Sequence, residues 1–167
     1  VVTVGSFDGL HVGHRDVIGR VRDLAKAKGG TSVVVTFDPH PRRLISPEDS
    51  PRLLTTLDEK SEAFERMGID VLAIVSFTQE LRSLTPEAFI DRYLVEFLDM
   101  TTVVVGYDHG FGKDRSGDLA TFERIGKKRG FEVVSVPPTL SEVEPVSSTR
   151  VRAHISLGEI ESAAKLL

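Results

Sequence analysis

The stretch GSFDGLHVGH, Gly5 to His14, joins a short apolar run to the first segment with helical periodicity. The run before it, Val1 to Val4, is rich in β-branched residues and is typical of a strand. After it, apolar residues recur at the spacing of one helix face until the pair Gly29-Gly30, which ends the pattern. We therefore expect this stretch to be the turn between a buried strand and a helix.

Four further β-branched runs follow, separated by segments with helical periodicity. They are Thr31 to Phe37, Val71 to Phe77, Thr102 to Val105 and Phe131 to Val136. Each run is almost continuously apolar, so we expect strands that are covered on both faces. The alternation of strands and helices predicts an α/β fold with a parallel sheet of about five strands.

Cap residues predict where several later helices begin. Thr56 followed by Glu59 indicates a capping box for a helix that stops at Gly68, and Thr85-Pro86 indicates a helix that runs through Leu94. Three more helices are expected over Gly117 to Lys128, Ser148 to Ser156 and Glu159 to Leu167.

The composition fits one globular domain and excludes several classes of protein. The 167 residues carry 21 Lys and Arg against 25 Asp and Glu, so a formal net charge of -4 gives no reason to expect nucleic acid or an anionic membrane as partner. Without cysteine there is no disulfide, thiolate nucleophile or zinc finger, which fits a cytoplasmic location. No apolar run approaches the roughly 18 residues of a membrane span. We expect that the chain is trimmed at its start and that a longer protein continues beyond Leu167.

The opening loop has the features of a phosphate site. In open parallel sheets, ligands bind outside the carboxyl ends of the strands, and the start of the following helix offers free N–H groups and a positive dipole end. His11 and His14 are three residues apart and share a helix face, and Gly5 and Gly13 allow close backbone approach. The spacing is neither GxGxxG nor GxxxxGK[ST]. The alternative is a tight turn with surface histidines; Asp8 could help to hold magnesium through phosphate oxygens.

A second polar cluster is VSSTRVR, Val146 to Arg152. Serine and threonine at a helix start are first of all N-caps, which is the alternative here. Arg152, in the first turns of the same helix, can donate two parallel hydrogen bonds to a polyphosphate whose other oxygens accept from the N–H groups at the helix start. This helix start and the one after the first strand can each bind an anion. Together they predict a nucleoside triphosphate as the ligand.

Two further loops follow strands. In TFDPHPRR, Thr36 to Arg43, the prolines are expected to hold the loop extended, with aromatic rings for stacking and arginines as cations; the alternative is a proline-rich connection. In GYDHGFGKDRSGD, Gly106 to Asp118, Asp108 could accept hydrogen bonds from a base or a ribose; the alternative is a mobile glycine loop.

These four motifs, in this order, resemble the adenylyltransferase (FAD synthetase) module of the bacterial bifunctional riboflavin kinase/FMN adenylyltransferase family. GSFDGLHVGH is similar to the HxGH signature of the nucleotidyltransferase superfamily. That signature alone would be shared with other transferases and with class I aminoacyl-tRNA synthetases. The four motifs together are more specific, and the resemblance covers essentially the whole chain.

The resemblance implies a Rossmann-like fold with helices on both faces of the sheet, and transfer of AMP from ATP to FMN with magnesium, giving FAD and pyrophosphate. It implies that residues 1–167 form the FMN adenylyltransferase domain, normally fused to a riboflavin kinase domain that is absent here. The catalytic residues implied are His11, His14 and Arg152. The ATP-binding residues implied are Gly5, Ser6, Phe7, Asp8, Gly13, Gly106, Asp108, Ser147, Ser148 and Thr149. The flavin-binding residues implied are Phe37, Asp38, Pro39, His40, Pro41 and Arg42.

Two other functions stay open at this point. One is another HxGH adenylyl- or cytidylyltransferase, with phosphopantetheine, nicotinamide mononucleotide or glycerol phosphate as acceptor. The other is a regulatory module that binds a nucleotide without catalysis. Two observations distinguish these two functions from FMN adenylylation. One is which acceptor supports turnover of ATP or CTP, and the other is whether pyrophosphate is released.

Overall fold

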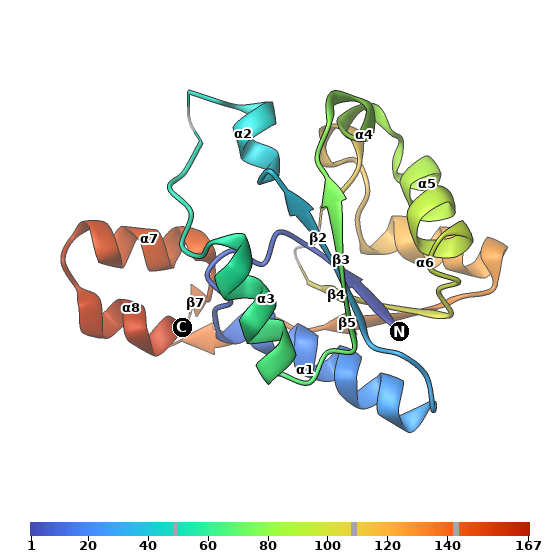
Figure 1. The fold of residues 1–167 in the computed structure, drawn as a ribbon, viewed down its shortest axis with the longest axis horizontal. Coiled ribbons are helices and arrows are strands. Elements are labelled where there is room, and N and C mark those ends of the chain that lie inside the picture. Colours follow the sequence, from blue (N-terminus) through green and yellow to red (C-terminus); the bar gives the residue numbers. More distant parts are fainter. Residues whose placement is uncertain (49, 108–109, 142–143) are drawn as a thin grey trace.

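The computed structural model describes residues 1–48, 50–107, 110–141 and 144–167. Its centre is a parallel five-stranded sheet in the order β3-β2-β1-β4-β5 (Figure 1). The strands are β1 (Val2–Val4), β2 (Val33–Asp38), β3 (Val71–Ser76), β4 (Thr102–Gly106) and β5 (Glu132–Val136). This confirms the predicted fold class, and each strand lies within two residues of its predicted bounds.

The helices fall where the caps predicted them, with several short additions. The described helices are α1 (Val12–Ala27), α2 (Pro41–Ile45), α3 (Leu57–Arg66), α4 (Gln79–Ser83), α5 (Pro86–Phe89), the π-helix η1 (Ile90–Glu96), the 3-10 turn η2 (Lys113–Arg115), α6 (Leu119–Arg129), α7 (Ser148–Ser156) and α8 (Ile160–Leu166). A small antiparallel pair, β6 (Leu140–Ser141) and β7 (Glu144–Pro145), precedes α7. The capping box of Thr56 and Glu59 is present. The helix predicted from Thr85 continues from α5 into η1 with π-helical geometry.

Helices cover both faces of the sheet, and the strand residues alternate between them. Val33 and Val35 point into a core shared with α5, η1 and α6, whereas Val34 between them packs with Phe64 of α3 and Ile18 of α1. The two cores therefore lie on opposite faces, as predicted.

The edge strand β3 differs from the prediction that every strand is covered on both faces. Val71 is 41% exposed and Ile74 is 48% exposed. The reason is topological, because β3 is the outer strand of the sheet, with β2 as its neighbour among the described strands (Figure 1). The apolar pattern of a strand does not report whether it lies at the centre or at the edge.

The strand order reverses at β1, which pairs with β2 on one side and with β4 on the other. In such sheets the crevice outside the carboxyl ends of these strands is the usual ligand site. The loop Gly5 to His14 leaves β1 at this place and enters α1. The α7 and α8 pair packs at the same end of the molecule, through Val151 and Leu166 against Val12 and Leu54 (Figure 1).

Candidate active site

The loop after β1 has a fixed and unusual backbone. Phe7 and Leu10 have φ angles of 48° and 44°, in the left-handed region, and both side chains are buried. The Phe7 ring packs edge-on against Phe64, with centroids 5.8 Å apart. Gly9 also has a positive φ of 82°, and a Cβ there would lie 2.6 Å from Leu54 Cδ1. Burial of the neighbouring side chains therefore holds the loop in one conformation, and position 9 requires glycine.

The other two glycines approach the loop's own rings. A Cβ at Gly5 would lie 3.0 Å from the Phe7 ring, and one at Gly13 would lie 3.4 Å from the His11 ring. The glycines at these two positions therefore allow the loop to pack closely on itself. Ser6, also predicted to bind ATP, offers its backbone oxygen to two side chains described below.

The structure brings His11 and His14 together. His11 is the N-cap of α1, and its Nδ1 accepts a hydrogen bond from the backbone N–H of His14 at 3.3 Å. The two rings stack with centroids 3.6 Å apart and planes 20° apart. The predicted pairing on one helical turn is thus present as a stacked pair at a helix N-terminus.

His14 is neutral near pH 7 in this structure. Burial, together with the smaller effects of the positive fields of His11 and Lys60, lowers its pKa to about 3. Within the described residues, the buried Nδ1 of His14 makes no hydrogen bond. A buried polar atom without a partner is costly, so this atom is available to a ligand.

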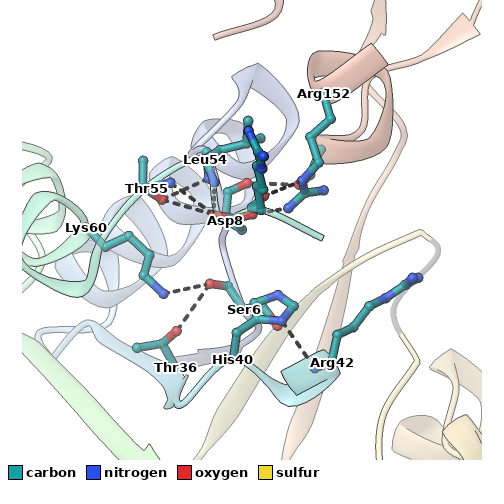
Figure 2. A network of polar contacts seen from close by, with 12 residues as sticks. Ser6, Asp8, Thr36, His40, Arg42, Leu54, Thr55, Lys60 and Arg152 are labelled. Carbon is teal, nitrogen blue, oxygen red and sulfur yellow. Dashed lines mark hydrogen bonds and ion pairs between the residues drawn. The ribbon is translucent and has the colours of Figure 1, made fainter. Parts of the chain in front are cut away.

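Asp8 and Arg152 form an ion pair between a buried carboxylate and a half-buried guanidinium. The Asp8 carboxylate is almost fully buried and accepts hydrogen bonds from the backbone N–H groups of Leu54, at 2.9 Å, and Thr55, at 3.1 Å. Its second oxygen pairs with the Arg152 guanidinium, whose Nε also donates to the Arg52 carbonyl at 2.8 Å (Figure 2). Two residues predicted separately, from opposite ends of the chain, therefore meet.

The second predicted phosphate motif docks on the first. Ser147 caps α7 by accepting from the Arg150 N–H, and Ser148 Oγ donates to the backbone oxygen of Asp8 at 2.9 Å. Thr149, the third predicted member of this motif, is exposed. The start of α7 thus lies against the loop after β1.

The proline-rich loop after β2 corrects one prediction. It is not extended, because Pro41 begins the short helix α2, with His40 as N-cap accepting from the Arg42 N–H at 3.2 Å. The peptide between Asp38 and Pro39 is cis. Proline suits the first helical position, where no N–H is needed.

The side chains of the loop after β2 lie in different environments, some in the core and others near the loop after β1. The Phe37 ring is part of the core and packs against Phe77, with centroids 5.6 Å apart. His40 lies near enough to Asp8 and Lys60 for their charges to act on its ring, and Arg42 is exposed. Burial lowers the pKa of His40; the Asp8 charge opposes this, while nearby cations reinforce it. His40 is therefore the member of this loop that reaches the loop after β1.

The glycine-rich loop contributes less to the described site. Gly106 ends β4 beside β1, while Asp108 and His109 lie outside the described residues. Phe111 is buried in the core and exchanges two backbone hydrogen bonds with Gly117, both at 3.0 Å.

Lys60 is a site residue that the sequence analysis missed. It projects from α3, is only 6% exposed, and its Nζ donates to the Ser6 backbone oxygen at 3.2 Å (Figure 2). The Thr36 hydroxyl donates to the same oxygen at 3.4 Å. The signal was present in the sequence, because Lys60 shares the apolar face of its helix with Phe64 and Met67.

The described residues do not form a magnesium site of their own. They contain no group of three or more His, Cys, Asp or Glu side chains that could hold a metal ion. Both oxygens of Asp8 are already engaged, by backbone N–H groups and by Arg152. This arrangement does not fit Asp8 as a metal ligand.

A cavity of about 510 Å³ lies beside the edge strand β3, between Ala73 to Ser76 and the η1 residues Arg92 and Tyr93. None of the predicted flavin-binding residues lines it.

The sheet order and the paired histidines at the start of α1 define an α/β domain of the nucleotidyltransferase type. A family model described as FAD synthetase matches residues 1–150, and the chain belongs to this family.

Three curated relatives carry the description bifunctional riboflavin kinase/FMN adenylyltransferase. The proteins from Listeria monocytogenes, Pseudomonas fluorescens and Bacillus subtilis are 38%, 36% and 34% identical to this chain, and each match covers 100% of it. The matches cover 53%, 53% and 52% of the relatives, so the chain spans about half the length of the curated relatives it matches.

Solved structures support the fold. A structure described as a macrolide-efflux protein from Streptococcus pneumoniae has a TM-score of 0.85 and 29% identity over 99% of this chain and 54% of its own. A pantoate-beta-alanine ligase from Francisella tularensis has a TM-score of 0.59 at 15% identity, over 95% of this chain and 68% of its own. None of the helices in the described parts of the chain is both long and apolar enough to cross a bilayer.

Proposed function

We propose that this domain transfers AMP from ATP to FMN, giving FAD and pyrophosphate. Membership of the FAD synthetase family and the descriptions of the relatives support this proposal. The observation that carries it is the stacked pair of His11 and His14 at the N-terminus of the 16-residue helix α1, with an unpartnered buried nitrogen on His14. Such a helix start attracts an anion through its free N–H groups and its dipole.

The chemistry is a direct displacement. An oxygen of the FMN phosphate attacks the α-phosphorus of ATP, the bond from that phosphorus to the β-phosphate breaks, and pyrophosphate leaves with the electron pair. No covalent enzyme intermediate forms, so the chain contributes positioning and stabilisation of developing charge. Ser147 and Ser148 act as a helix cap and a loop anchor, and neither is a nucleophile.

Each of the two motifs has a distinct task in this proposal. His14 enters the reaction as a neutral imidazole, so it donates a hydrogen bond to a phosphate oxygen rather than supplying a full positive charge. Arg152 supplies the charge: within the described residues its Nε and one terminal nitrogen are engaged, and its other terminal nitrogen makes no hydrogen bond. That nitrogen is the group we assign to the ATP phosphates.

Further parts of the proposal rest on the family. We propose that Mg²⁺ arrives with ATP, held by phosphate oxygens, and we derive no step through a ligand from Asp8. The loop from Phe37 to Arg42 is assigned to FMN, with His40 as its contact to the reacting groups. Residues 1–167 are assigned to the adenylyltransferase domain, which the curated relatives combine with riboflavin kinase. The cytoplasmic location stays a prediction.

The test is a product assay with the 167-residue chain. Incubation with ATP, Mg²⁺ and FMN is expected to give FAD and pyrophosphate in equal amounts, and riboflavin in place of FMN is expected to give no FMN. Parallel reactions use phosphopantetheine or nicotinamide mononucleotide with ATP, and glycerol phosphate with CTP. Turnover with one of these and none with FMN would show a different acceptor. ATP binding without pyrophosphate from any acceptor would show a regulatory module.

A further inference from the structure

Lys60 carries a buried charge that the contacts of the chain do not explain. An ammonium group has three N–H donors, and among the described contacts Lys60 Nζ makes one hydrogen bond, to the Ser6 backbone oxygen at 3.2 Å. No carboxylate in the described parts of the chain lies within ion-pair distance of it. Asp8 and Asp38 favour its charged form from farther away, but burial has the larger effect and lowers the pKa of Lys60.

A structural role does not require this charge. The Ser6 oxygen also accepts from the Thr36 hydroxyl, so it keeps a partner without Lys60. The position lies on the apolar face of α3, one turn before Phe64, where an uncharged side chain of the same length would pack. Replacing a buried charge by an apolar group of similar volume is often neutral or stabilising. A charge kept here points to a role outside folding.

The position of Lys60 indicates what that role is. Its ammonium lies close enough to His14 and to His40 to act on both rings electrostatically. It therefore acts both on the histidine pair of α1 and on the loop assigned to FMN, from its place beside the Ser6 carbonyl (Figure 2). Among the described residues of this site, Lys60 is a buried cation and Arg152 a half-buried one.

We propose that the Lys60 ammonium binds an oxygen of the phosphate groups that react, the FMN phosphate or the α-phosphate of ATP. The inference rests on the proposed function and deepens it by adding a phosphate-binding residue from α3. When the new bond to the α-phosphorus forms and the bond to the β-phosphate breaks, negative charge spreads over the oxygens of the transferred group. An ammonium with two free donors stabilises that charge without gaining or losing a proton.

The first test is Lys60→Met, with Lys127→Met on the exposed side of α6 as matched control. We expect kcat for FAD formation to fall by about 10²-fold in Lys60→Met, while the melting temperature stays level or rises. Lys127→Met is expected to match the wild type in both. A wild-type kcat in a folded Lys60→Met variant would overturn the inference.

Binding measurements identify the phosphate. If Lys60 contacts the FMN phosphate, Lys60→Met weakens FMN binding and leaves riboflavin binding unchanged, because riboflavin lacks the phosphate. If it contacts ATP, the variant weakens ATP binding and leaves adenosine binding unchanged. A loss of kcat with all four affinities intact places the contact in the transition state. Equal losses for riboflavin and FMN, or for adenosine and ATP, would contradict a phosphate contact.

The absence of cysteine allows a second test that does not depend on the stability of one variant. Lys60→Cys carries a single thiol, which 2-aminoethyl methanethiosulfonate converts to a side chain with an ammonium and propyl methanethiosulfonate converts to a neutral one of matched length. We expect the first reagent to restore at least about a tenth of the wild-type kcat and the second to restore none. Equal restoration by both would show a packing role and refute the inference. If the wild type makes no FAD, the proposed function itself is wrong. The wild-type assay therefore distinguishes failure of the proposed function from failure of this inference.

Discussion

The Arg152 guanidinium pairs with the buried Asp8 carboxylate across 144 residues of sequence. Ser148 adds a second link between the same segments through the Asp8 backbone oxygen. The α7 helix is therefore fastened to the loop after β1 at the place where the histidine pair lies. One consequence is that the role of Arg152 in catalysis has to be measured apart from its role in neutralising Asp8.

A double-mutant comparison separates these roles. Arg152→Ala leaves the Asp8 charge buried and unpaired, so we expect the free energy of unfolding to fall by about 3–5 kcal/mol. Adding Asp8→Asn removes that charge while its amide oxygen can still accept from Leu54 and Thr55, so most of the stability should return. FAD formation should be slow in both variants, because the activation free energy is expected to lie about 2–4 kcal/mol above that of the wild type. Arg152→Lys should lie between wild type and alanine. Recovery of the rate in the double variant would confine Arg152 to a structural role.

The depressed pKa of His14 predicts how stability depends on pH. The folded chain holds this ring neutral down to a pKa of about 3, whereas the unfolded chain binds the proton near 6.5. The unfolded state therefore binds more protons between these values, and the free energy of unfolding should fall as the pH drops from 6.5 toward 3. The slope from this residue is up to about 1.4 kcal/mol per pH unit. Urea titrations of the wild type and of His14→Gln check it, and identical slopes would show that the ring is not buried neutral.

His14 should act on turnover more than on flavin binding. A donor that meets charge developing on the transferred group contributes mainly in the transition state, so we expect His14→Ala to lower kcat by about 10²-fold with little change in FMN affinity. Steady-state kinetics and an FMN titration provide the two numbers. A collapse of FMN affinity with normal turnover at saturation would assign this histidine to the other substrate.

Two substitutions of His40 distinguish capping from substrate contact. His40→Ala removes both the cap of α2 and the ring, whereas His40→Asn keeps a side chain that caps helices well. We expect FMN affinity and the rate of FAD formation to fall in both variants, because the proposed function assigns the ring itself to a contact with FMN. Normal values for His40→Asn beside impaired ones for His40→Ala would mean that only the cap matters.

Local patterns in the sequence predicted the elements well, because their causes are local. The β-branched runs gave all five strands of the parallel sheet, and Ser147 capped α7 at the expected residue. The predicted Thr56 and Glu59 box also formed. Each depends on side chains within four residues of one another, which a single sequence displays.

Features that depend on distant residues could not be read in the same way. The pairing of Asp8 with Arg152 joins segments that are far apart in the sequence. Arg152 was predicted to bind phosphate and Asp8 to bind ATP and help to hold magnesium, and neither pattern indicated that the two residues pair. Lys60 was overlooked because a lysine in a helix is usually solvated, even though this one shares the apolar face of α3 with Phe64 and Met67; the packing of α3 against the loop after β1 shows that it is buried. The loop of Pro39 and Pro41 was misjudged as extended because the same residue, proline, suits both an extended chain and the first turn of a helix.

The left-handed backbone at Phe7 and Leu10 has a thermodynamic consequence for recognition. Holding two residues other than glycine in this region costs on the order of 1–3 kcal/mol each, a cost that folding meets through the burial of their side chains. The entropy of ordering the loop is therefore lost when the chain folds and not when the nucleotide arrives. The loop is therefore preorganised for the substrate. A larger part of the substrate's binding energy remains for aligning the attacking oxygen with the phosphorus.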